Sequence, residues 1–210
     1  YYLTHLNIDF LLYFNYIYKY FPYIQTNCYN KLKIDDVGLY SISTPKNADI
    51  ISKIIKKYFL TNNIIITDAM AGVGGNTLSF SSFFYYVNAI ELETKRFNYL
   101  ISNLDLYNKT NILCYNGNYL DIMYKIKQDV IFLDPPWGGK SYKDLEEISI
   151  MIGNLTLESL CDQIRLEKIC KILILKLPLN YNIMNFSNEL KNNMEIEKLQ
   201  KMIIIVFVIK

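Results

Sequence analysis

The sequence has 210 residues, which is enough for one domain with a full hydrophobic core and a short appendage but not for two independent domains. Hydrophobic residues make up 51% and charged residues 20%, a balance that excludes general disorder. The formal net charge of +2 excludes binding through a broad basic surface, so any contact with nucleic acid must be local.

Neither the cysteines nor the apolar runs indicate a metal site or a membrane segment. The four cysteines contain no Cys-x-x-Cys pair and are Cys28, Cys114, Cys161 and Cys170. The single histidine, His5, does not complete a zinc set with them, so we predict no metal and free thiols in a reducing compartment. The longest uncharged apolar runs, 10–18 and 202–209, are shorter than the roughly 18 to 20 residues of a spanning helix. We therefore expect a soluble intracellular protein, with nucleus and cytoplasm both open.

The first segment of the chain is predicted to be a short helical arm. Residues 4–30 are dense in aromatic side chains, and their spacing allows one or two short helices. Farther on, Thr44 followed by Pro45 predicts a helix start, because a hydroxyl cap and a proline at the first helical position favour one. We place the arm at 1–44, packed on a main domain at 45–210. The buried face of the helix after Pro45 is predicted to carry Ile50, Ile51, Ile54, Ile55, Tyr58 and Phe59.

Short apolar runs alternate with helical stretches over the rest of the chain. Six of these runs are predicted strands, at 64–67, 87–90, 111–114, 130–133, 171–177 and 202–209. Such alternation predicts an α/β fold with a mainly parallel sheet covered by helices on both faces. A seventh run at 194–199 is followed at once by 202–209, which predicts an antiparallel pair closing the sheet. That ending is typical of methyltransferase-like sheets rather than of all-parallel dinucleotide-binding sheets.

Residues 64–77 combine a strand, a glycine-rich turn and a helix start. Glycines at 72, 74 and 75 allow close backbone approach to a ligand, and a helix start presents free amide donors. Glu91 ends the second strand 19 residues after Gly72, where this architecture places a carboxylate against a ribose. Asp68 stands where a carboxylate can meet the ammonium group of an amino-acid cofactor. The two acids favour S-adenosylmethionine, whereas a dinucleotide such as NAD fits less well because Asp68 would repel its pyrophosphate.

Two further polar residues near this loop allow two interpretations each. Glu93 is either part of a solvated face or a cofactor contact. Asn118 follows the third strand, where an amide can meet the adenine amino group, but Asn116-Gly117 is also a strong signal for an ordinary turn. We keep Asn118 in the predicted cofactor site.

The segment Asp134-Pro135-Pro136-Trp137 follows the fourth strand and is the predicted catalytic segment. Two prolines fix the backbone rigidly and place an aromatic plane beside carbonyl oxygens, which suits a flat base. An exocyclic amine is a poor nucleophile because its lone pair is delocalised into the ring. The Asp134 side chain and the Pro135 carbonyl can orient such an amine, so that alignment supplies most of the acceleration and no metal is required.

Taken together, these motifs resemble the RNA cap guanine-N2 methyltransferases, the trimethylguanosine synthase family. The matching segments run in the family's order and lie at 19–21, 38–45, 68–77, 89–93 and 134–139. The most specific are Gly-Val-Gly-Gly-Asn-Thr at 72–77 and Asp-Pro-Pro-Trp-Gly-Gly at 134–139. The resemblance covers the chain from about Lys19 to its end.

The resemblance implies a class I methyltransferase core, Rossmann-like, with a mainly parallel seven-stranded sheet and a terminal antiparallel strand, plus the helical arm. It also implies that Trp137 stacks on the methylated guanine, and a cationic 7-methylguanine ring should stack on indole better than guanine does. Lys19, Lys46 and Lys140 are candidates for the cap phosphates. The predicted cofactor site comprises Thr44, Asp68, Ala69, Gly72, Gly74, Gly75, Asn76, Thr77, Glu91, Asn118 and Asp134.

The sequence also departs from the family's pattern at four positions. Asp134 stands where eukaryotic members usually carry serine, and Lys46 where glutamate is common. Glu91 and Asn118 stand where aspartates are usual. The change at Asp134 leaves open whether the product carries one or two N2 methyl groups.

The predicted function is therefore N2 methylation of a 7-methylguanosine RNA cap, with capped RNA as partner and a monomer expected. One alternative is an rRNA or DNA methyltransferase acting on a guanine or adenine amine, which would use the same catalytic segment. Another is a non-catalytic cap-binding module, against which the intact set of Asp68, the loop glycines and Glu91 argues.

Overall fold

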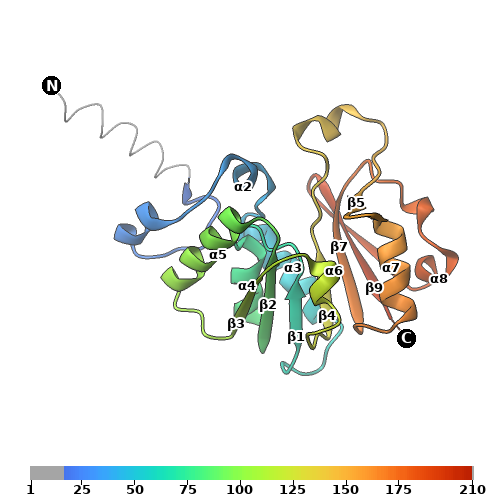
Figure 1. Ribbon diagram of the computed structural model, residues 1–210, viewed down its shortest axis with the longest axis horizontal. Helices are drawn as coiled ribbons and strands as arrows, with labels where there is room; N and C mark the ends of the chain where they lie inside the picture. The colour runs from blue at the N-terminus through green and yellow to red at the C-terminus, as the bar shows by residue number, and fades with distance from the viewer. Residues whose placement is uncertain (1–16, 210) are drawn as a thin grey trace.

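The computed structural model describes residues 17–209, which form a three-layer α/β fold around one seven-stranded sheet (Figure 1). The strand order is β3-β2-β1-β4-β7-β9-β8. The strands are β1 (Ile65–Asp68), β2 (Tyr86–Glu91), β3 (Ile112–Asn116), β4 (Val130–Leu133), β7 (Ile172–Pro178), β8 (Met194–Leu199) and β9 (Met202–Val208). The strands β1, β2, β3, β4 and β7 pair in parallel, whereas β9 runs antiparallel to both of its neighbours. The carboxyl ends of β1, β2, β4 and β7 therefore share one edge.

The seven predicted strands are all present, and the predicted class I methyltransferase sheet is confirmed. The chain-terminal strand β9 is the antiparallel one, but it lies between β7 and β8 rather than at the edge. A two-stranded hairpin of β5 (Met151–Ile152) and β6 (Leu155–Thr156) was not predicted. Each of its strands has two residues, too few to show a two-residue alternation of side chains.

Helices cover both faces of the sheet. The longer ones are α3 (Pro45–Lys56), α4 (Gly75–Phe83), α5 (Thr94–Leu106) and α7 (Leu157–Leu166). Shorter ones are η1 (Thr26–Lys31), α2 (Asp36–Ser41), α6 (Tyr119–Ile122), η2 (Lys140–Asp144), η3 (Ile183–Asn185) and α8 (Asn188–Lys191). No helix formed by residues 17–209 is both long and apolar enough to cross a membrane.

Two hydrophobic layers follow the alternation of side chains along the central strands. On one face, α3 and α4 pack over the side chains of Val130 and Phe132 in β4 and of Ile172 and Ile174 in β7. On the other face, α7 packs over residues of opposite parity, such as Leu173. Because side chains alternate between the two faces every second residue, position 176 of β7 lies on the face of the sheet that α3 and α4 cover.

The predicted start of α3 is confirmed. The Thr44 hydroxyl accepts a hydrogen bond from the amide of Asn47 at 3.4 Å, and Pro45 is the first helical residue. Of the predicted buried face, Ile51, Ile54 and Ile55 are fully buried, while the flanking apolar residues pack partly buried against the same cluster. The cap and the apolar spacing together therefore define this helix.

The described part of the arm packs on the main domain. The side chains of Ile17, Phe21 and Leu32 are buried in a cluster that also contains Val73 from the glycine turn and Leu100 of α5. The predicted helices upstream of residue 17 lie outside the described residues. The division of the chain at residue 44 remains our prediction.

Candidate active site

A cavity of about 570 Å³ lies at the shared carboxyl edge of β1, β2, β4 and β7. Its size is in the range of small-molecule sites. Figure 1 shows α2 and the segment that contains η2 at this same edge of the molecule. The cavity wall combines the glycine turn, α2 and the residues after it, the segment after β4, the β5–β6 hairpin and the turn between β8 and β9. These segments lie far apart in the sequence, and the sheet brings them together.

The glycine turn joins β1 to α4. Gly74 precedes α4 with a φ of +102°, a conformation that side chains other than hydrogen disfavour. At Gly75 an added Cβ would lie 2.5 Å from Cγ1 of Ile42, so only glycine lets the arm approach the helix start. The turn therefore presents the first backbone amides of α4 to the cavity, which is lined by Gly72, Gly75 and Asn76.

Asp68 ends β1, is fully buried and does not itself line the cavity, whereas the next residue, Ala69, does. Its Oδ2 accepts a hydrogen bond from the Thr77 hydroxyl at 2.6 Å. Burial raises the pKa of Asp68 to about 7, the hydrogen bond from Thr77 and the Lys176 ammonium oppose the rise, and the nearby Asp134 carboxylate adds to it. A cation bound nearby would therefore favour the ionised form of Asp68 near neutral pH.

Three buried polar atoms near the start of α4 have no hydrogen-bond partner among the described residues: Ser43 Oγ, Asp68 Oδ1 and Asn76 Oδ1. Ser43 and Asn76 also line the cavity. A buried polar atom left unpaired costs about 1 to 3 kcal/mol, so such a group indicates a missing ligand. Three oxygens beside free helix amides fit an amino-acid cofactor, which has an ammonium group to donate and a carboxylate to accept.

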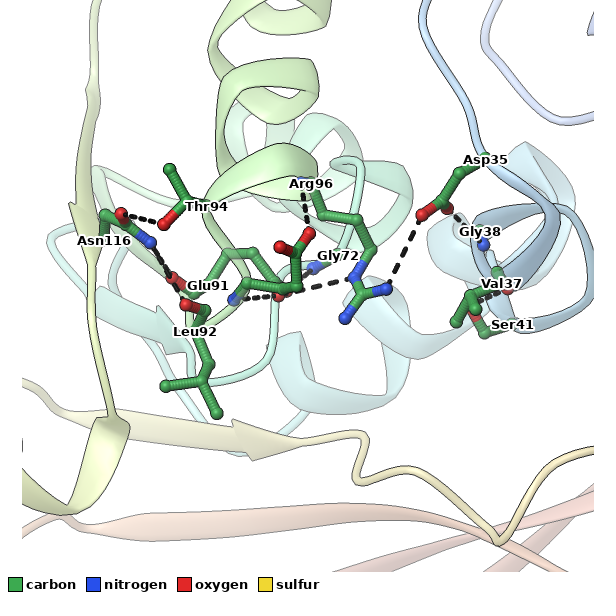
Figure 2. Close-up of polar contacts among 11 residues, drawn as sticks. Asp35, Val37, Gly38, Ser41, Gly72, Glu91, Leu92, Thr94, Arg96 and Asn116 are labelled. Carbon is green, nitrogen blue, oxygen red and sulfur yellow. Dashed lines mark hydrogen bonds and ion pairs between the residues drawn. The ribbon is translucent and has the colours of Figure 1, made fainter.

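Glu91 lies at the end of β2 and belongs to the polar network shown in Figure 2. Its Oε2 accepts a hydrogen bond from the Gly72 amide at 2.9 Å, and its Oε1 lies 3.5 Å from Nε of Arg96. The Arg96 guanidinium continues to Asp35, whose Oδ2 lies 3.6 Å from Nη1. Asp35 in turn caps α2 by accepting from the Gly38 amide at 2.8 Å. The network thus connects the arm to the glycine turn.

Three of the polar residues considered from the sequence are helix caps. Thr44 caps α3 and does not line the cavity, whereas its neighbour Ser43 does. Glu93 accepts from the Arg96 amide at the start of α5. Asn118 accepts from the Leu120 amide at the start of α6 and also lines the cavity. The side-chain oxygen of each cap is therefore engaged by the protein.

Asp134 follows β4 and forms an ion pair with Lys176 of β7, with 2.6 Å between Oδ2 and Nζ. The side chain of Lys176 is 4% exposed and that of Asp134 is 14% exposed. Burial raises the pKa of Asp134 above its ordinary value, and the Lys176 ammonium opposes this rise. Both residues line the cavity, but the sequence analysis did not single out Lys176.

Trp137 is half-buried and lines the same cavity. Its indole nitrogen donates to the main-chain carbonyl of Lys176 at 3.3 Å. The Tyr142 ring packs edge-on at 84°, with 5.1 Å between the ring centroids. The Lys176 ammonium lies 5.5 Å from the indole centroid. These contacts fix the indole plane next to the Asp134 carboxylate.

The lysines around the cavity differ from those proposed from the sequence. Lys19 and Lys46 are exposed and do not line the cavity, and the side chain of Lys140 lies outside the described part of the structure. Lys143 in η2 and Lys201 in the β8–β9 turn do line it and are exposed. The structure therefore places two other cations at the mouth. Over residues 17–209, no His, Cys, Asp and Glu side chains group in a way that could hold a metal ion.

A family model for RNA cap guanine-N2 methyltransferases matches residues 63–207. The chain belongs to this family. The match begins just before β1 and ends in β9, so it covers the whole sheet and the cavity edge. The protein is accordingly a methyltransferase, and membership of the RNA cap guanine-N2 methyltransferase family implies S-adenosylmethionine as the methyl donor.

Relatives of this family member among known sequences include a viral protein and a yeast enzyme. An uncharacterised protein of Acanthamoeba polyphaga mimivirus is 34% identical over 207 residues, covering 85% of this chain and 81% of that protein. The trimethylguanosine synthase of Schizosaccharomyces pombe is 28% identical over 130 residues, covering 55% of this chain and 53% of the yeast protein. The aligned region thus spans about half the length of the yeast enzyme.

Solved structures share the fold. A precorrin-6Y C5,15-methyltransferase from Geobacter metallireducens aligns with a TM-score of 0.59 at 11% identity, covering 85% of this chain and 94% of that one. An rRNA methylase from Streptococcus thermophilus aligns with a TM-score of 0.51 at 10% identity, covering 80% of this chain and 99% of that one. At such low identity these likenesses show the architecture alone, that of class I methyltransferases.

Proposed function

We propose that the protein transfers a methyl group from S-adenosylmethionine to the exocyclic N2 amine of a 7-methylguanosine RNA cap. One observation carries the proposal: the Asp134 carboxylate and the Trp137 indole line the same cavity as the glycine turn. A base stacked on Trp137 would hold its amine beside Asp134, with the cofactor half of the site adjoining. Membership of the cap guanine-N2 family and the similarity to a trimethylguanosine synthase support this substrate.

The cofactor half of the cavity is proposed to hold S-adenosylmethionine through the glycine turn. Asp68 Oδ1 and the other unpaired oxygens near α4 would accept hydrogen bonds from the ammonium group. Glu91, fixed by the Gly72 amide, would accept from the ribose hydroxyls. Asn118 lines the wall where the adenine ring would lie. When bound, the cofactor supplies an electrophilic methyl group on a sulfonium ion.

The substrate half is proposed to orient the amine. Asp134 would accept one N–H of the amine and the Pro135 carbonyl the other, which aligns the nitrogen lone pair for attack. After transfer the amine must lose a proton, and the Asp134 carboxylate, which lines the cavity, would accept it. Trp137 would stack on the base, and the positive charge of a 7-methylguanine ring strengthens that contact.

The cap phosphates are proposed to lie at the mouth of the cavity. Lys143 and Lys201 line it from two different segments and are exposed, so both can reach a triphosphate bridge. We propose these two in place of Lys19 and Lys46, which do not line the cavity.

A second candidate is methylation of a base amine in rRNA or DNA. It is favoured by the aspartate at position 134, since Asp-Pro-Pro-aromatic segments occur in other base amine methyltransferases. In that case the base would be flipped into the same cavity, and no cationic ring would be needed for stacking.

The deciding experiment is an incubation with labelled S-adenosylmethionine and either 7-methylguanosine or unmethylated guanosine cap dinucleotides. Transfer to the 7-methylguanosine cap, with mass spectrometry placing one or two methyl groups on N2, supports the proposal. Transfer to neither dinucleotide, with transfer to total rRNA or DNA, would favour the second candidate. Transfer to the unmethylated cap at the same rate would contradict selection of the charged base.

A further inference from the structure

A buried lysine stands in a strand that is otherwise apolar. The strand β7 reads Ile-Leu-Ile-Leu-Lys-Leu-Pro, and all seven of its residues are buried. Lys176 lies on the side of the sheet that carries Ile172 and Ile174, where a hydrophobic side chain is expected. Burying an ammonium group carries a large desolvation cost, which must be offset by close partners.

The Lys176 ammonium has three N–H donors, and the protein engages it in three directions. One is Asp134 Oδ2 at 2.6 Å, the second is the main-chain carbonyl of Ser41 at 3.4 Å, and the third is the face of Trp137, with its centroid at 5.5 Å. Two of the N–H groups are thus directed at protein oxygens, and the ammonium group faces the indole. We therefore expect Lys176 to act on the reaction through Asp134 or Trp137.

The ion pair also sets which Asp134 oxygen remains available. Oδ2 is held by Lys176, while none of the described residues donates a hydrogen bond to Oδ1. Because Asp134 lines the cavity, Oδ1 is the oxygen left for a ligand. The pair carries no net charge, so it presents a hydrogen-bond acceptor without adding net charge beside the indole.

We propose that Lys176 is a positioning residue for methyl transfer: its ammonium group keeps the Asp134 carboxylate ionised and turns Oδ1 toward the substrate amine. This rests on the proposed role of Asp134 in orienting that amine. An ionised carboxylate accepts a stronger hydrogen bond from the amine than a protonated acid does and can take up the proton that the amine releases.

The same two strands provide a matched control. At their amino ends, Asp129 and Lys171 form an ion pair with 2.7 Å between Oδ1 and Nζ, but the Lys171 side chain is 70% exposed. The register pairs Val130 with Ile172 and Leu133 with Leu175, so the two Asp–Lys pairs lie at opposite ends of one strand pair. Lys171→Met therefore removes an exposed Asp–Lys pair at the other end of the same strands, whereas Lys176→Met removes the buried pair at the cavity.

The test is the pH profile of turnover for wild type, Lys176→Met and Lys171→Met, with S-adenosylmethionine saturating and a 7-methylguanosine cap dinucleotide as substrate. Without the ammonium, burial raises the pKa of Asp134 further, so the acidic limb should move up by about 1 to 3 pH units. Lys176→Met should thus lose most of its activity near pH 6 and recover much of it near pH 8.5. Lys171→Met should follow wild type, and Lys176→Arg should keep the acidic limb near its wild-type position because the cation is kept.

Other charged groups around Asp134 are common to all the variants. Asp68 from β1 is its titrating neighbour, and the remaining charged residues of the cavity are Glu91, Arg96, Lys143 and Lys201. Saturating cofactor removes the titration of Asp68 from the comparison. A fall in turnover by the same factor at every pH would overturn the proposal, because a merely structural lysine would act in that way.

A readout without turnover separates this inference from the proposed function. Trp137 is the only tryptophan, and it contacts Lys176, so its fluorescence should report the ionisation of the pair. The fluorescence transition should move to higher pH in Lys176→Met. If wild type methylates no cap, the proposed function fails, but the fluorescence titration still tests Lys176. A transition at the same pH in both proteins would overturn the positioning role.

A further variant covers the case in which Lys176→Met does not fold. Asp134→Ser alone leaves a buried ammonium without its counter-ion, whereas Asp134→Ser with Lys176→Met removes both charges. The double variant should be the more stable of the two in thermal denaturation. Equal stability would mean that the ammonium does not depend on Asp134, contrary to the proposal.

Discussion

The two halves of the cavity hold their carboxylates in different ways. On the cofactor side, Asp68 and Glu91 are held by uncharged donors, the Thr77 hydroxyl and the Gly72 amide, with the Arg96 guanidinium at the longer distance of 3.5 Å. On the substrate side, Asp134 is held by a buried ammonium at 2.6 Å. Among the described residues Asp68 therefore has no ion-pair partner of its own, while the carboxylate of the second half is neutralised within the protein.

This difference suits two different ligands. An ammonium group gains most from a carboxylate that has no cation of its own, and Asp68 Oδ1 is such a group. A flat amine gains most from an oriented acceptor beside an aromatic plane, which Asp134 and Trp137 provide. If the two halves are separate in function, variants on one side should spare binding on the other, and the following predictions use that criterion.

The largest effect is expected for Asp134→Asn. The amide keeps the shape of the side chain but cannot take up a proton, so turnover should fall on the order of 100-fold or more. Calorimetry should find the affinity for S-adenosylmethionine little changed, because Asp134 lies in the substrate half. Asp129→Asn, at the opposite end of β4, is the control and should keep wild-type turnover. A weakened cofactor affinity with normal turnover would reverse our assignment of the two halves.

The next effect concerns Asp68, whose pKa is raised to about 7. If the ionised form binds the cofactor ammonium, affinity should be highest at about pH 7 to 8, because an α-amino group has an ordinary pKa of about 7.7 to 8.0 and loses its charge at higher pH. Below pH 7 it should fall by up to about tenfold per pH unit, because the free protein must first lose a proton. Titration calorimetry over this range measures the slope.

The matched variant for this titration is Asp68→Asn. It still accepts the hydrogen bond from Thr77 but cannot ionise, so its affinity should be about 10- to 150-fold weaker at about pH 7.5 and should not fall further below pH 7. Binding of 7-methylguanosine triphosphate should be unaffected. A slope that persists in Asp68→Asn would assign the titration to another group.

An effect of similar or smaller size is expected for Trp137→Ala on the substrate side. Loss of stacking should weaken the binding of 7-methylguanosine triphosphate by about 1 to 3 kcal/mol, and Trp137→Phe should keep part of this binding energy. Cofactor affinity should stay near wild type. In wild type, 7-methylguanosine triphosphate should quench the Trp137 fluorescence more than guanosine triphosphate does. Equal quenching by the two nucleotides would remove charge-selective stacking from the account.

The smallest effect is expected at the mouth. Lys143→Ala and Lys201→Ala should each lower the affinity for 7-methylguanosine triphosphate by a few-fold at low salt, because exposed charge pairs contribute up to about 1 kcal/mol. The loss should shrink as salt is added. Binding of the nucleoside 7-methylguanosine, which has no phosphates, should be unchanged. An equal loss of affinity for the nucleoside and the triphosphate would exclude a phosphate contact.

The fold could be predicted because the strands are short apolar runs and because α3 carries a cap and an apolar face at helical spacing. The apolar runs from 130 to 133 and from 194 to 199 coincide with β4 and β8. Thr44 and Pro45 marked the start of α3. The place of β9 inside the sheet was not predicted, since adjacency of strands depends on packing between segments rather than on local sequence.

Residues of the candidate site could be predicted where a short segment of sequence is enough to identify a strand end or a glycine turn. Asp68, Gly72 and Asp134 lie at strand ends, where parallel sheets bind ligands. Lys176 was missed because its partner is set by the register of β4 and β7, although a lysine inside an apolar strand was a visible signal. Lys143 and Lys201 were missed because nothing local distinguishes them from other surface lysines.

The interior position of β9 affects the order in which parts of the protein can fold during synthesis. Lys176 pairs with Ile204 of β9, a strand that follows every other described strand in the sequence. On the ribosome, β7 therefore emerges with one edge unpaired, because it ends at residue 178 and its neighbour β9 begins only at residue 202. The substrate half can form completely only after β9 has been translated. A nascent chain should therefore acquire the cofactor turn before the capacity for methyl transfer.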